Sequence, residues 1–388
     1  MRILHTSDWH IGKKLNNKSR LDEQAEVLAE ICELCDEQKT QLVIIAGDIF
    51  DTYLPSAEAE ELFFATVCRL ATPERAVIII SGNHDDWQRL CASRNLASKN
   101  NVYIFGGILA PSSGSAKVYA SECGVNHAVI TDGKESLYVG LLPYPGEQKL
   151  GEKSSDIPYQ ERMREWINQC FEQNVNEFAQ IFVSHLFMLG GVSGESERQI
   201  DLGGARVVDR DLIPKNVLYT ALGHLHKRQI IDGNRNIIYS GSPLQYSYDE
   251  ILHEKSVTFF EVDCKNKEVK NLNVVPLEKG KRLVKCVALS VEEGKKLLGL
   301  YSNCHVELTL KLSGVLSDRE TRELSSEYPS LNQLKLEIIS SEQKSTFASR
   351  KNLNDSQLFN EYYKKKFSEQ APQKLLEAYL EVLSEVKK

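Results

Sequence analysis

The stretch that decides the fold is LVIIAGDIFD, residues 42–51. Its first half, Leu42 to Ala46, is an unbroken apolar run, which is typical of a strand buried on both faces in a sheet covered by helices. Similar runs alternate with segments of helical period along the chain. We therefore predict an α/β fold built in layers. The expected strands are residues 2–6, 42–46, 77–81, 137–142, 180–184, 217–222 and 237–240.

Side chains that can bind metal ions follow these apolar strands. Open α/β sheets gather their active sites at the carboxyl ends of strands, so we expect the groups that follow each strand to converge. One Asp-x-His is common by chance, and a lone buried histidine is usually a satisfied core residue. A whole series, each member ending a buried strand, is not explained in that way. The candidates are Asp8, His10, Asp48, Asp51, Asn83, His84, His185, His224 and His226.

The residue types in this series suit a pair of metal ions. Carboxylate and amide oxygens with neutral imidazoles, and no thiolate, favour manganese, iron or zinc over magnesium alone. An aspartate has two oxygens and can bridge two cations about 3.5–4 Å apart, as two-metal hydrolysis requires. We assign that bridging position to Asp48.

In chain order, the motifs DxH, GDxxD, GNHD, H and GHxH resemble the calcineurin-like metallophosphoesterases. The stretches MRILHTSDWHIGKKL, ESER (195–198) and GSPLQYSYDE (241–250) further resemble the SbcD-type nucleases of bacterial SbcCD complexes. The resemblance implies a four-layer α-β-β-α sandwich with a small α/β capping domain and C-terminal helices. It also implies a two-metal DNA nuclease, acting as a 3′–5′ exonuclease on double strands and as an endonuclease on single strands and hairpins, in DNA end processing, replication and recombination.

The resemblance assigns a role to each candidate. Two divalent ions are implied, with manganese expected. His84 would be the catalytic acid, because an imidazole with a pKa near 6.5 can protonate a leaving oxygen at neutral pH. The Asp51 side chain would orient and charge His84 through a hydrogen bond, and its alternative role is a helix N-cap. The implied ligands are Asp8, His10 and His226 for one ion, Asn83, His185 and His224 for the other, and Asp48 as the bridge.

The chain divides into four expected segments. Residues 1–276 would form the nuclease domain, 277–340 the capping domain, 341–354 a polar linker and 355–388 a pair of amphipathic helices. The pattern of these helices fits equally well packing on their own domain and binding in a partner's groove. The resemblance implies that they dock at the coiled-coil base of an SbcC-type ATPase.

Two further sets of residues are candidates for contacts. Lys13 and Lys14 follow His10, where a DNA phosphate could lie, although solvated surface lysines are an equal alternative. Helices around Leu62, Phe63 and Leu90 pack in the core in the simplest interpretation. In SbcD-like nucleases the same helices resemble the two-fold contact of a homodimer, which would lie within a heterotetramer.

Composition excludes several classes of protein. The formal net charge of −7 and the pI near 5.8 do not suit a protein that coats nucleic acid by bulk charge. Apolar runs are too short to span a membrane and the N-terminus lacks a signal pattern, so we expect a cytoplasmic protein. Nine scattered cysteines fit reduced thiols, and the single CxxC, Cys32 and Cys35, fits core packing.

Two rival functions remain at this point. One is a phosphatase or cyclic-nucleotide phosphodiesterase of the same superfamily, acting on a small molecule or a protein. Protein phosphatases of that class continue GDxxD with Arg-Gly, whereas Thr52 and Tyr53 follow Asp51 here. The other rival is a partner-binding subunit with a vestigial metal site, but no ligand position is lost.

Overall fold

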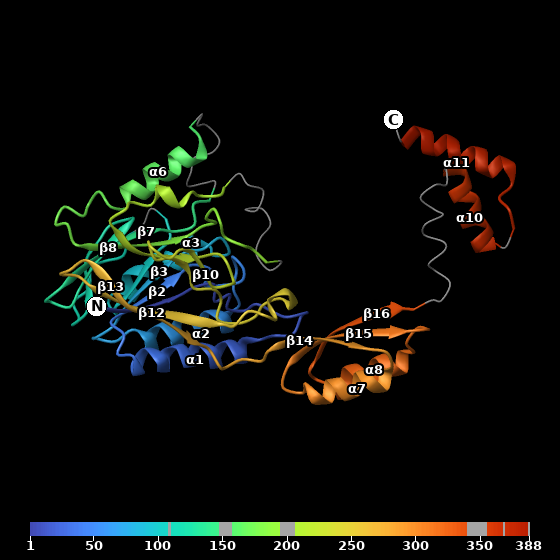
Figure 1. Cartoon of the computed structure of the whole chain (residues 1–388), viewed down its shortest axis with the longest axis horizontal. Helices are drawn as coiled ribbons and strands as arrows, with labels where there is room; N and C mark the ends of the chain where they lie inside the picture. Colours follow the sequence, from blue (N-terminus) through green and yellow to red (C-terminus); the bar gives the residue numbers. More distant parts are fainter. Residues whose placement is uncertain (108–109, 147–156, 195–205, 340–354, 368, 387–388) are drawn as a thin grey trace.

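Three β-sheets organise the chain (Figure 1). The structure is a computed structural model that describes residues 1–107, 110–146, 157–194, 206–339, 355–367 and 369–386. Two large sheets form the main body, and the third belongs to a small module that follows it in the sequence.

The first large sheet has the strand order β13-β12-β1-β2-β3-β4. Strands β1 to β4 are parallel, and the hairpin β12-β13 adds to β1 in the antiparallel sense. Every residue of β2 and β3 is buried, as their continuous apolar sequences predict. The strands are β1 (Arg2–Thr6), β2 (Leu42–Ala46), β3 (Ala76–Ile80), β4 (Val102–Phe105), β12 (Ser256–Asp263) and β13 (Glu268–Pro276).

The second large sheet has the order β10-β11-β9-β8-β7-β6-β5. Its central strands β7, β8, β9 and β11 are parallel, and antiparallel hairpins close both edges. The strands are β5 (Tyr119–Cys123), β6 (His127–Thr131), β7 (Ser136–Leu142), β8 (Ala179–His185), β9 (Val217–Gly223), β10 (Gln229–Asp232) and β11 (Ile237–Tyr239).

Helices cover the outer faces of the two large sheets. Helices α1 and α2 pack on the first sheet and α6 on the second, with a separate apolar core between the sheets (Figure 1). The main body is therefore a four-layer α-β-β-α sandwich, which confirms the predicted fold class. Its helices are α1 (Leu21–Glu37), α2 (Ala57–Leu70), α3 (Trp87–Cys91), α4 (Arg94–Ser98) and α6 (Tyr159–Gln169).

The small module contains a parallel sheet of order β14-β15-β16. Serine side chains cap both of its helices, and one of them, Ser317, forms a capping box with Glu320. Contacts with the main body include the Lys18 ammonium, which donates to the Leu331 carbonyl at 2.7 Å. The elements are β14 (Leu283–Ala288), α7 (Val291–Leu300), β15 (His305–Leu312), α8 (Asp318–Glu327) and β16 (Leu331–Ile338).

Two helices, α10 (Asp355–Phe367) and α11 (Gln373–Val386), lie beyond the small module. The rings of Phe359 and Tyr379 stack at 4.1 Å between centroids and join the two helices. The predicted linker, residues 341–354, lies outside the described residues. The boundaries of the four predicted segments therefore stay predictions.

The burial of two cysteines and the length of the helices bear on two further predictions. Cys32 and Cys35 are free thiols in the core beneath α1, as predicted. Within the described ranges, none of the helices combines the length and the apolar character needed to cross a bilayer.

Candidate metal centre

The candidate residues converge where the carboxyl ends of both large sheets meet. The turns after the strands are bonded to one another: the amide of Asp8 donates to the Gly47 carbonyl at 3.0 Å, and the amide of His224 donates to the Asp8 carboxylate at 3.0 Å. The first of these bonds joins two turns of the same sheet, and the second joins a turn of one sheet to a turn of the other. The structure therefore brings together the carboxylate, amide and imidazole side chains that follow the strands in the sequence.

Close approach of the turns, both within one sheet and between the two sheets, explains the glycines in these motifs. A Cβ on Gly82 would lie 2.1 Å from Asp48 Oδ1, and one on Gly47 would lie 2.4 Å from His185 Nδ1. Gly47 also has a φ of +90°, in the left-handed region that glycine adopts readily. The glycine before each polar residue leaves the space that its neighbour's side chain occupies.

Four of the candidate residues have left-handed backbone themselves. The φ angles are 54° at Asp8, 43° at His10, 51° at Asp48 and 106° at His224. Such values are uncommon for residues other than glycine and are concentrated at functional sites. The turns after β1, β2 and β9 are thus held in a conformation that the surrounding packing imposes.

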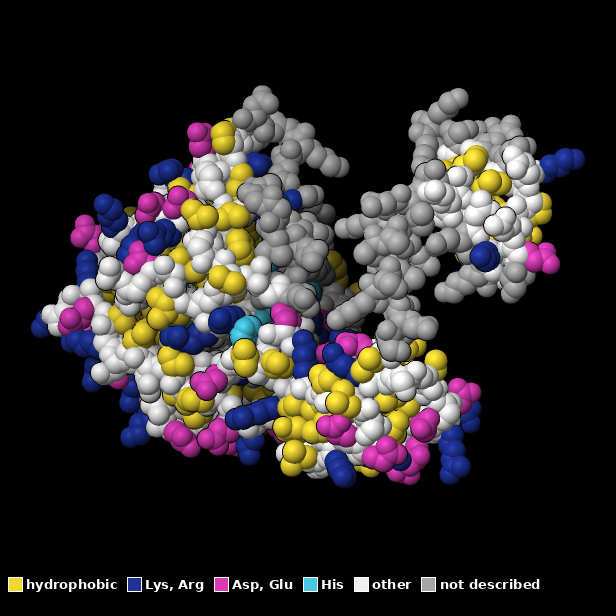
Figure 2. Space-filling view, turned by 45° about the vertical axis from the view of Figure 1, so that its right-hand side comes forward, with side chains coloured by type: hydrophobic (Ala, Val, Ile, Leu, Met, Phe, Trp, Pro, Cys, Tyr) yellow, Lys and Arg dark blue, Asp and Glu magenta, His cyan; other side chains and the backbone are white. Residues whose placement is uncertain are grey.

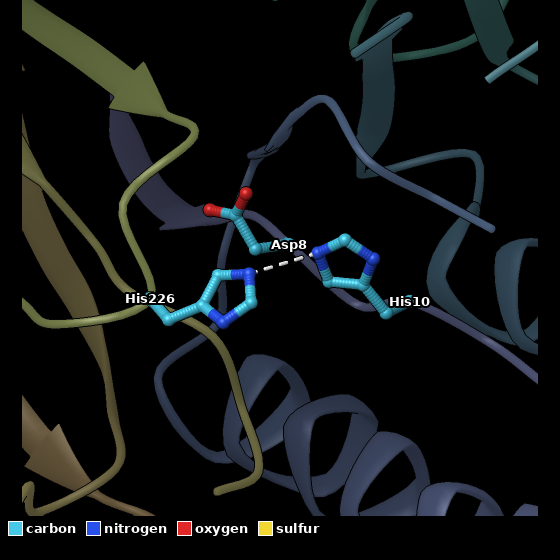
Figure 3. A group of neighbouring side chains, drawn as sticks. All are labelled: Asp8, His10 and His226. Atoms are coloured by element: carbon cyan, nitrogen blue, oxygen red, sulfur yellow. Dashed lines mark hydrogen bonds between the residues drawn. The ribbon is translucent and has the colours of Figure 1, made fainter. Parts of the chain in front are cut away.

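One group of ligand atoms consists of Asp8, His10 and His226 (Figure 3). The Nε2 atoms of His10 and His226 face each other at 3.0 Å. All three side chains are almost completely buried, and burial lowers the pKa of His10 to about 3. Neutral imidazoles aimed at a common point beside a carboxylate are suited to hold a cation.

The second group consists of Asn83, His185 and His224. The Oδ1 atom of Asn83 lies 2.9 Å from His185 Nε2 and 3.0 Å from His224 Nδ1. The Nδ1 atom of His185 lies 2.9 Å from the Ala46 carbonyl, to which it donates, so in the neutral ring Nε2 is the nitrogen that carries the lone pair. An amide oxygen and two imidazole nitrogens therefore meet within contact distance.

Asp48 lies between the two groups. Its Oδ2 atom is 3.5 Å from both His10 Nε2 and His185 Nε2, and its Oδ1 atom accepts from the His84 amide at 2.8 Å. This is the position that a bridging carboxylate occupies in a two-metal site.

The electrostatics of the site also favour cations. Burial raises the pKa of Asp8 to about 6. Burial opposes the charge on His185 as well, but the Asp48 carboxylate beside it raises the pKa of His185 to about 9. Buried carboxylates that draw protons onto their neighbours are expected to bind divalent ions in exchange for those protons. The donor set therefore fits the pair of metal ions that the family implies.

His84 and Asp51 interact, but differently from the prediction. The Nδ1 atom of His84 donates to the main-chain carbonyl of Asp51 at 2.7 Å. The Asp51 carboxylate instead pairs with Lys13 at 2.9 Å and lies 3.6 Å from His10 Nδ1. The alternative role of Asp51 as an N-cap is also wrong, because Ser56 caps α2.

Two residues near the site were not selected from the sequence. The Asp85 carboxylate accepts hydrogen bonds from the amides of Ile49, Phe50 and Gly82, and so joins the turns after β2 and β3. The ring of Tyr246 lies edge-on to the rings of His10 and His226, at 5.5 and 5.8 Å between centroids. Asp85 belongs to the GNHD motif and Tyr246 to the stretch GSPLQYSYDE, and these motifs could have identified both residues.

The two lysine candidates differ in exposure. Lys13 is partly buried by its ion pair with Asp51 and by the ring of Tyr246, whereas Lys14 is exposed. Figure 2 shows histidine side chains reaching the surface in the middle of one face, with lysine and arginine side chains on either side of them. Acidic side chains lie among these basic ones in the same view.

The helices predicted to form the dimer contact expose other apolar residues than the predicted Leu62, Phe63 and Leu90. Phe63 and Leu90 lie in the apolar core beneath α2 and α3, and Leu62 is partly buried against it. The exposed apolar side chains of this region are Phe64 and Leu96, which are 43% and 68% exposed. The helices turn Phe63 and Leu90 toward the sheet, so these two residues are unavailable to a partner.

Residues 1–228 match the family model described as calcineurin-like phosphoesterase. Over its full length the chain is 33% identical to SbcD, the D component of nuclease SbcCD, of Bacillus subtilis strain 168. That alignment of 405 residues covers 100% of this chain and 98% of the Bacillus protein. The chain belongs to the SbcD family.

Other SbcD proteins match over a shorter span. Identity is 31% over 274 residues with the protein of Rhodobacter capsulatus, covering 68% of this chain and 66% of that protein. With the protein of Staphylococcus epidermidis it is 30% over 279 residues, covering 72% of this chain and 70% of that protein. The family inferred from the motifs is confirmed, and the chain is a metal-dependent phosphodiesterase of the SbcD family.

Proposed function

We propose that this chain cleaves phosphodiester bonds of DNA as the nuclease subunit of an SbcCD-type complex. The observation that carries the proposal is the convergence of two groups of ligand atoms on either side of Asp48. Similarity over the full length to an SbcD protein supports DNA, and not a small ester, as the substrate of this site. We propose 3′–5′ exonuclease action on double strands and endonuclease action on single strands and hairpins.

Two divalent ions are part of this proposal, and manganese is the metal we expect. Asp8, His10 and His226 would hold one ion, and Asn83, His185 and His224 the other. The mixed nitrogen and oxygen donors without thiolate support this choice. When bound, the ions supply a water of lowered pKa as the nucleophile and neutralise charge on the phosphate oxygens.

His84 is the proposed general acid. Its Nδ1–H is held by the Asp51 carbonyl, which leaves Nε2 as the atom that carries or releases the transferred proton. The ring packs edge-on to His10 at 4.7 Å between centroids, so the acid lies beside the metal ligands. At neutral pH an imidazolium at this position can protonate the departing sugar oxygen.

DNA contacts are proposed for the exposed Lys14 and for Lys13, whose ammonium also pairs with Asp51. Lysine and arginine side chains that lie near histidines on one face support a local attraction for phosphates (Figure 2). Cleavage is then expected to weaken as salt is added. Nine free cysteines fit the reducing cytoplasm, where we place this activity.

The C-terminal helices are proposed to dock on an SbcC-type ATPase. Four of their large apolar side chains are more than a third exposed, as a partner-binding face requires: Leu358, Tyr362, Leu375 and Leu380. A chain that ends at Asn354 should lose co-purification with SbcC and keep metal binding. Co-purification that survives this deletion would refute the docking proposal.

We further propose that the chain forms a homodimer within a heterotetramer, and that residues 277–340 cap the DNA. The exposed Phe64 and Leu96 support a contact through the region of α2 and α4. Sedimentation of Leu96→Glu should show monomers at concentrations at which the parent is dimeric. A dimer that persists in this variant would place the contact elsewhere.

The test of the main proposal is manganese-dependent degradation of end-labelled linear DNA, with and without SbcC and ATP. His84→Gln should lose about 10²–10⁴-fold in rate, the contribution typical of a general acid, while both ions stay bound. Bis-nitrophenyl phosphate serves as the small substrate. Hydrolysis of this ester without cleavage of DNA, even with the ATPase present, would favour a small-molecule phosphodiesterase.

A further inference from the structure

A buried carboxylate lies directly behind one of the proposed ligands. Glu250, at the end of the short 3₁₀ helix Tyr248–Glu250, is 1% exposed. Its Oε1 atom lies 3.2 Å from His226 Nδ1. A carboxylate can only accept, so the proton resides on Nδ1 and the lone pair on Nε2. That Nε2 atom is the one that faces His10 at 3.0 Å.

Lys255 holds this carboxylate in place. Its ammonium lies 2.5 Å from Glu250 Oε2, and it also donates to the His226 carbonyl at 2.9 Å and to Ser242 Oγ at 2.8 Å. One cation therefore contacts both the carboxylate and the main chain of the ligand. The side-chain and main-chain positions of His226 are fixed by the same pair of residues.

The main chain of Glu250 is anchored as well. Gln245 donates from Nε2 to the Glu250 carbonyl at 3.0 Å and accepts from the amide of Leu283, in β14, at 2.9 Å. The small module thus helps to hold the turn that carries Glu250. With its backbone and carboxylate both bonded, Glu250 presents a fixed acceptor to His226.

The other imidazoles are held by weaker acceptors. Main-chain carbonyls of Asp51 and Ala46 accept from Nδ1 of His84 and of His185. For His10, the Asp51 carboxylate is 3.6 Å from Nδ1, beyond hydrogen-bond distance. An ionised acceptor behind a ligating histidine makes that ligand more basic and fixes its orientation.

We propose that Glu250 is a positioning residue for the ion held by Asp8, His10 and His226. It keeps His226 in the tautomer that binds metal through Nε2, and Lys255 holds the carboxylate in place. The inference rests on the two-metal site of the proposed function. Glu250 lies in the stretch GSPLQYSYDE, which marks the family, and its sequence position alone indicated no role for it.

The test measures metal binding and does not depend on DNA cleavage. Metal-free full-length protein is titrated with Mn²⁺, and free Mn²⁺ is followed by electron paramagnetic resonance. Glu250→Gln should weaken one of the two binding events by about 10–100-fold, the range seen when such outer partners are changed. The other event should keep its affinity. Glu254→Gln, which changes an exposed carboxylate on the same loop, is the matched control and should bind as the parent does.

A second pair of measurements assigns the weakened event. In an Asn83→Ala background the second ion is lost, and Glu250→Gln should still weaken the event that remains. Lys255→Met should weaken the same event by a smaller factor, because the carboxylate stays but is less firmly held. If Glu250→Gln unfolds when EDTA removes its metal ions, the titration of Lys255→Met decides the question.

Three outcomes oppose the inference. Affinities that match the parent in both Glu250→Gln and Lys255→Met would overturn it, as would an equal loss at both metal sites. A loss confined to the Asn83 group would also contradict it. A parent protein that binds fewer than two ions would instead refute the proposed two-metal function, so the two failures are distinguishable.

Discussion

A single methyl group placed where the two large sheets meet should disable the metal centre. A Cβ on Gly223, the last residue of β9, would lie 1.9 Å from the Ala46 carbonyl oxygen. Real Cβ contacts begin near 3.0 Å, so in Gly223→Ala the ends of β9 and β2 must separate by about 1.1 Å. The Ala46 carbonyl also accepts from His185 Nδ1, so this ligand moves too. Misplacement by about 1 Å costs about 100-fold in rate, which is the loss expected here.

The assay is hydrolysis of bis-nitrophenyl phosphate with manganese, accompanied by metal titration. Gly233→Ala is the control, because its Cβ would meet only Ile230 Cγ2, at 3.8 Å, and should leave the rate unchanged. We expect Gly223→Ala to lose affinity at the His185 side of the site as well as rate. If Gly223→Ala hydrolyses the ester as fast as the parent does, the fixed spacing of the sheets is not what sets the site geometry.

Three other changes have expected outcomes. Asp85→Ala leaves three buried amides without their acceptor and should lower the free energy of unfolding by about 3 kcal/mol or more in urea titrations; an unchanged midpoint would mean that water replaces the carboxylate. Burial tends to raise the pKa of Glu23, but hydrogen bonds, among them one from His305 at 2.6 Å, lower it from 4.5 to about 2. Its contribution to stability is therefore present above about pH 4.5 and is lost as the pH falls toward about 2. The melting temperature of Glu23→Gln should fall less than that of the parent across this pH range. Burial raises the pKa of Cys35 to about 12, so at pH 8 an alkylating reagent should modify the exposed Cys68 and should reach Cys35 only after unfolding, as peptide mapping would show.

The main body could be predicted from the sequence because its central strands are buried on both faces. Unbroken apolar runs such as β2 have no other stable environment in a protein of this kind. The convergence of the candidate ligands followed from the same property, since parallel strands bring their carboxyl ends to one edge. Strand β13 was missed, because it is a largely exposed edge strand and lacks that apolar signal. Its partner β12 is mostly buried and carries apolar residues, so it could have been predicted.

Other details depend on contacts between distant segments, which the sequence does not display. The role of Asp51 was predicted for its side chain, yet its carbonyl is what holds His84. Every residue has a carbonyl, so no pattern of residue types can reveal this. Phe63 and Phe64 are adjacent and equally apolar, and only the direction in which α2 packs decides that Phe63 is buried and Phe64 exposed.

The left-handed backbone of the ligand turns has a consequence for engineering. Asp8, His10 and Asp48 each keep a φ near 50° that glycine would adopt at lower cost. Laboratory evolution that rewards heat resistance alone is therefore expected to replace these residues first, and to discard metal binding as it gains melting temperature. A more heat-resistant version of this enzyme must be sought by screening for retained metal binding together with survival of heating, with substitutions directed to the small module and the outer helices.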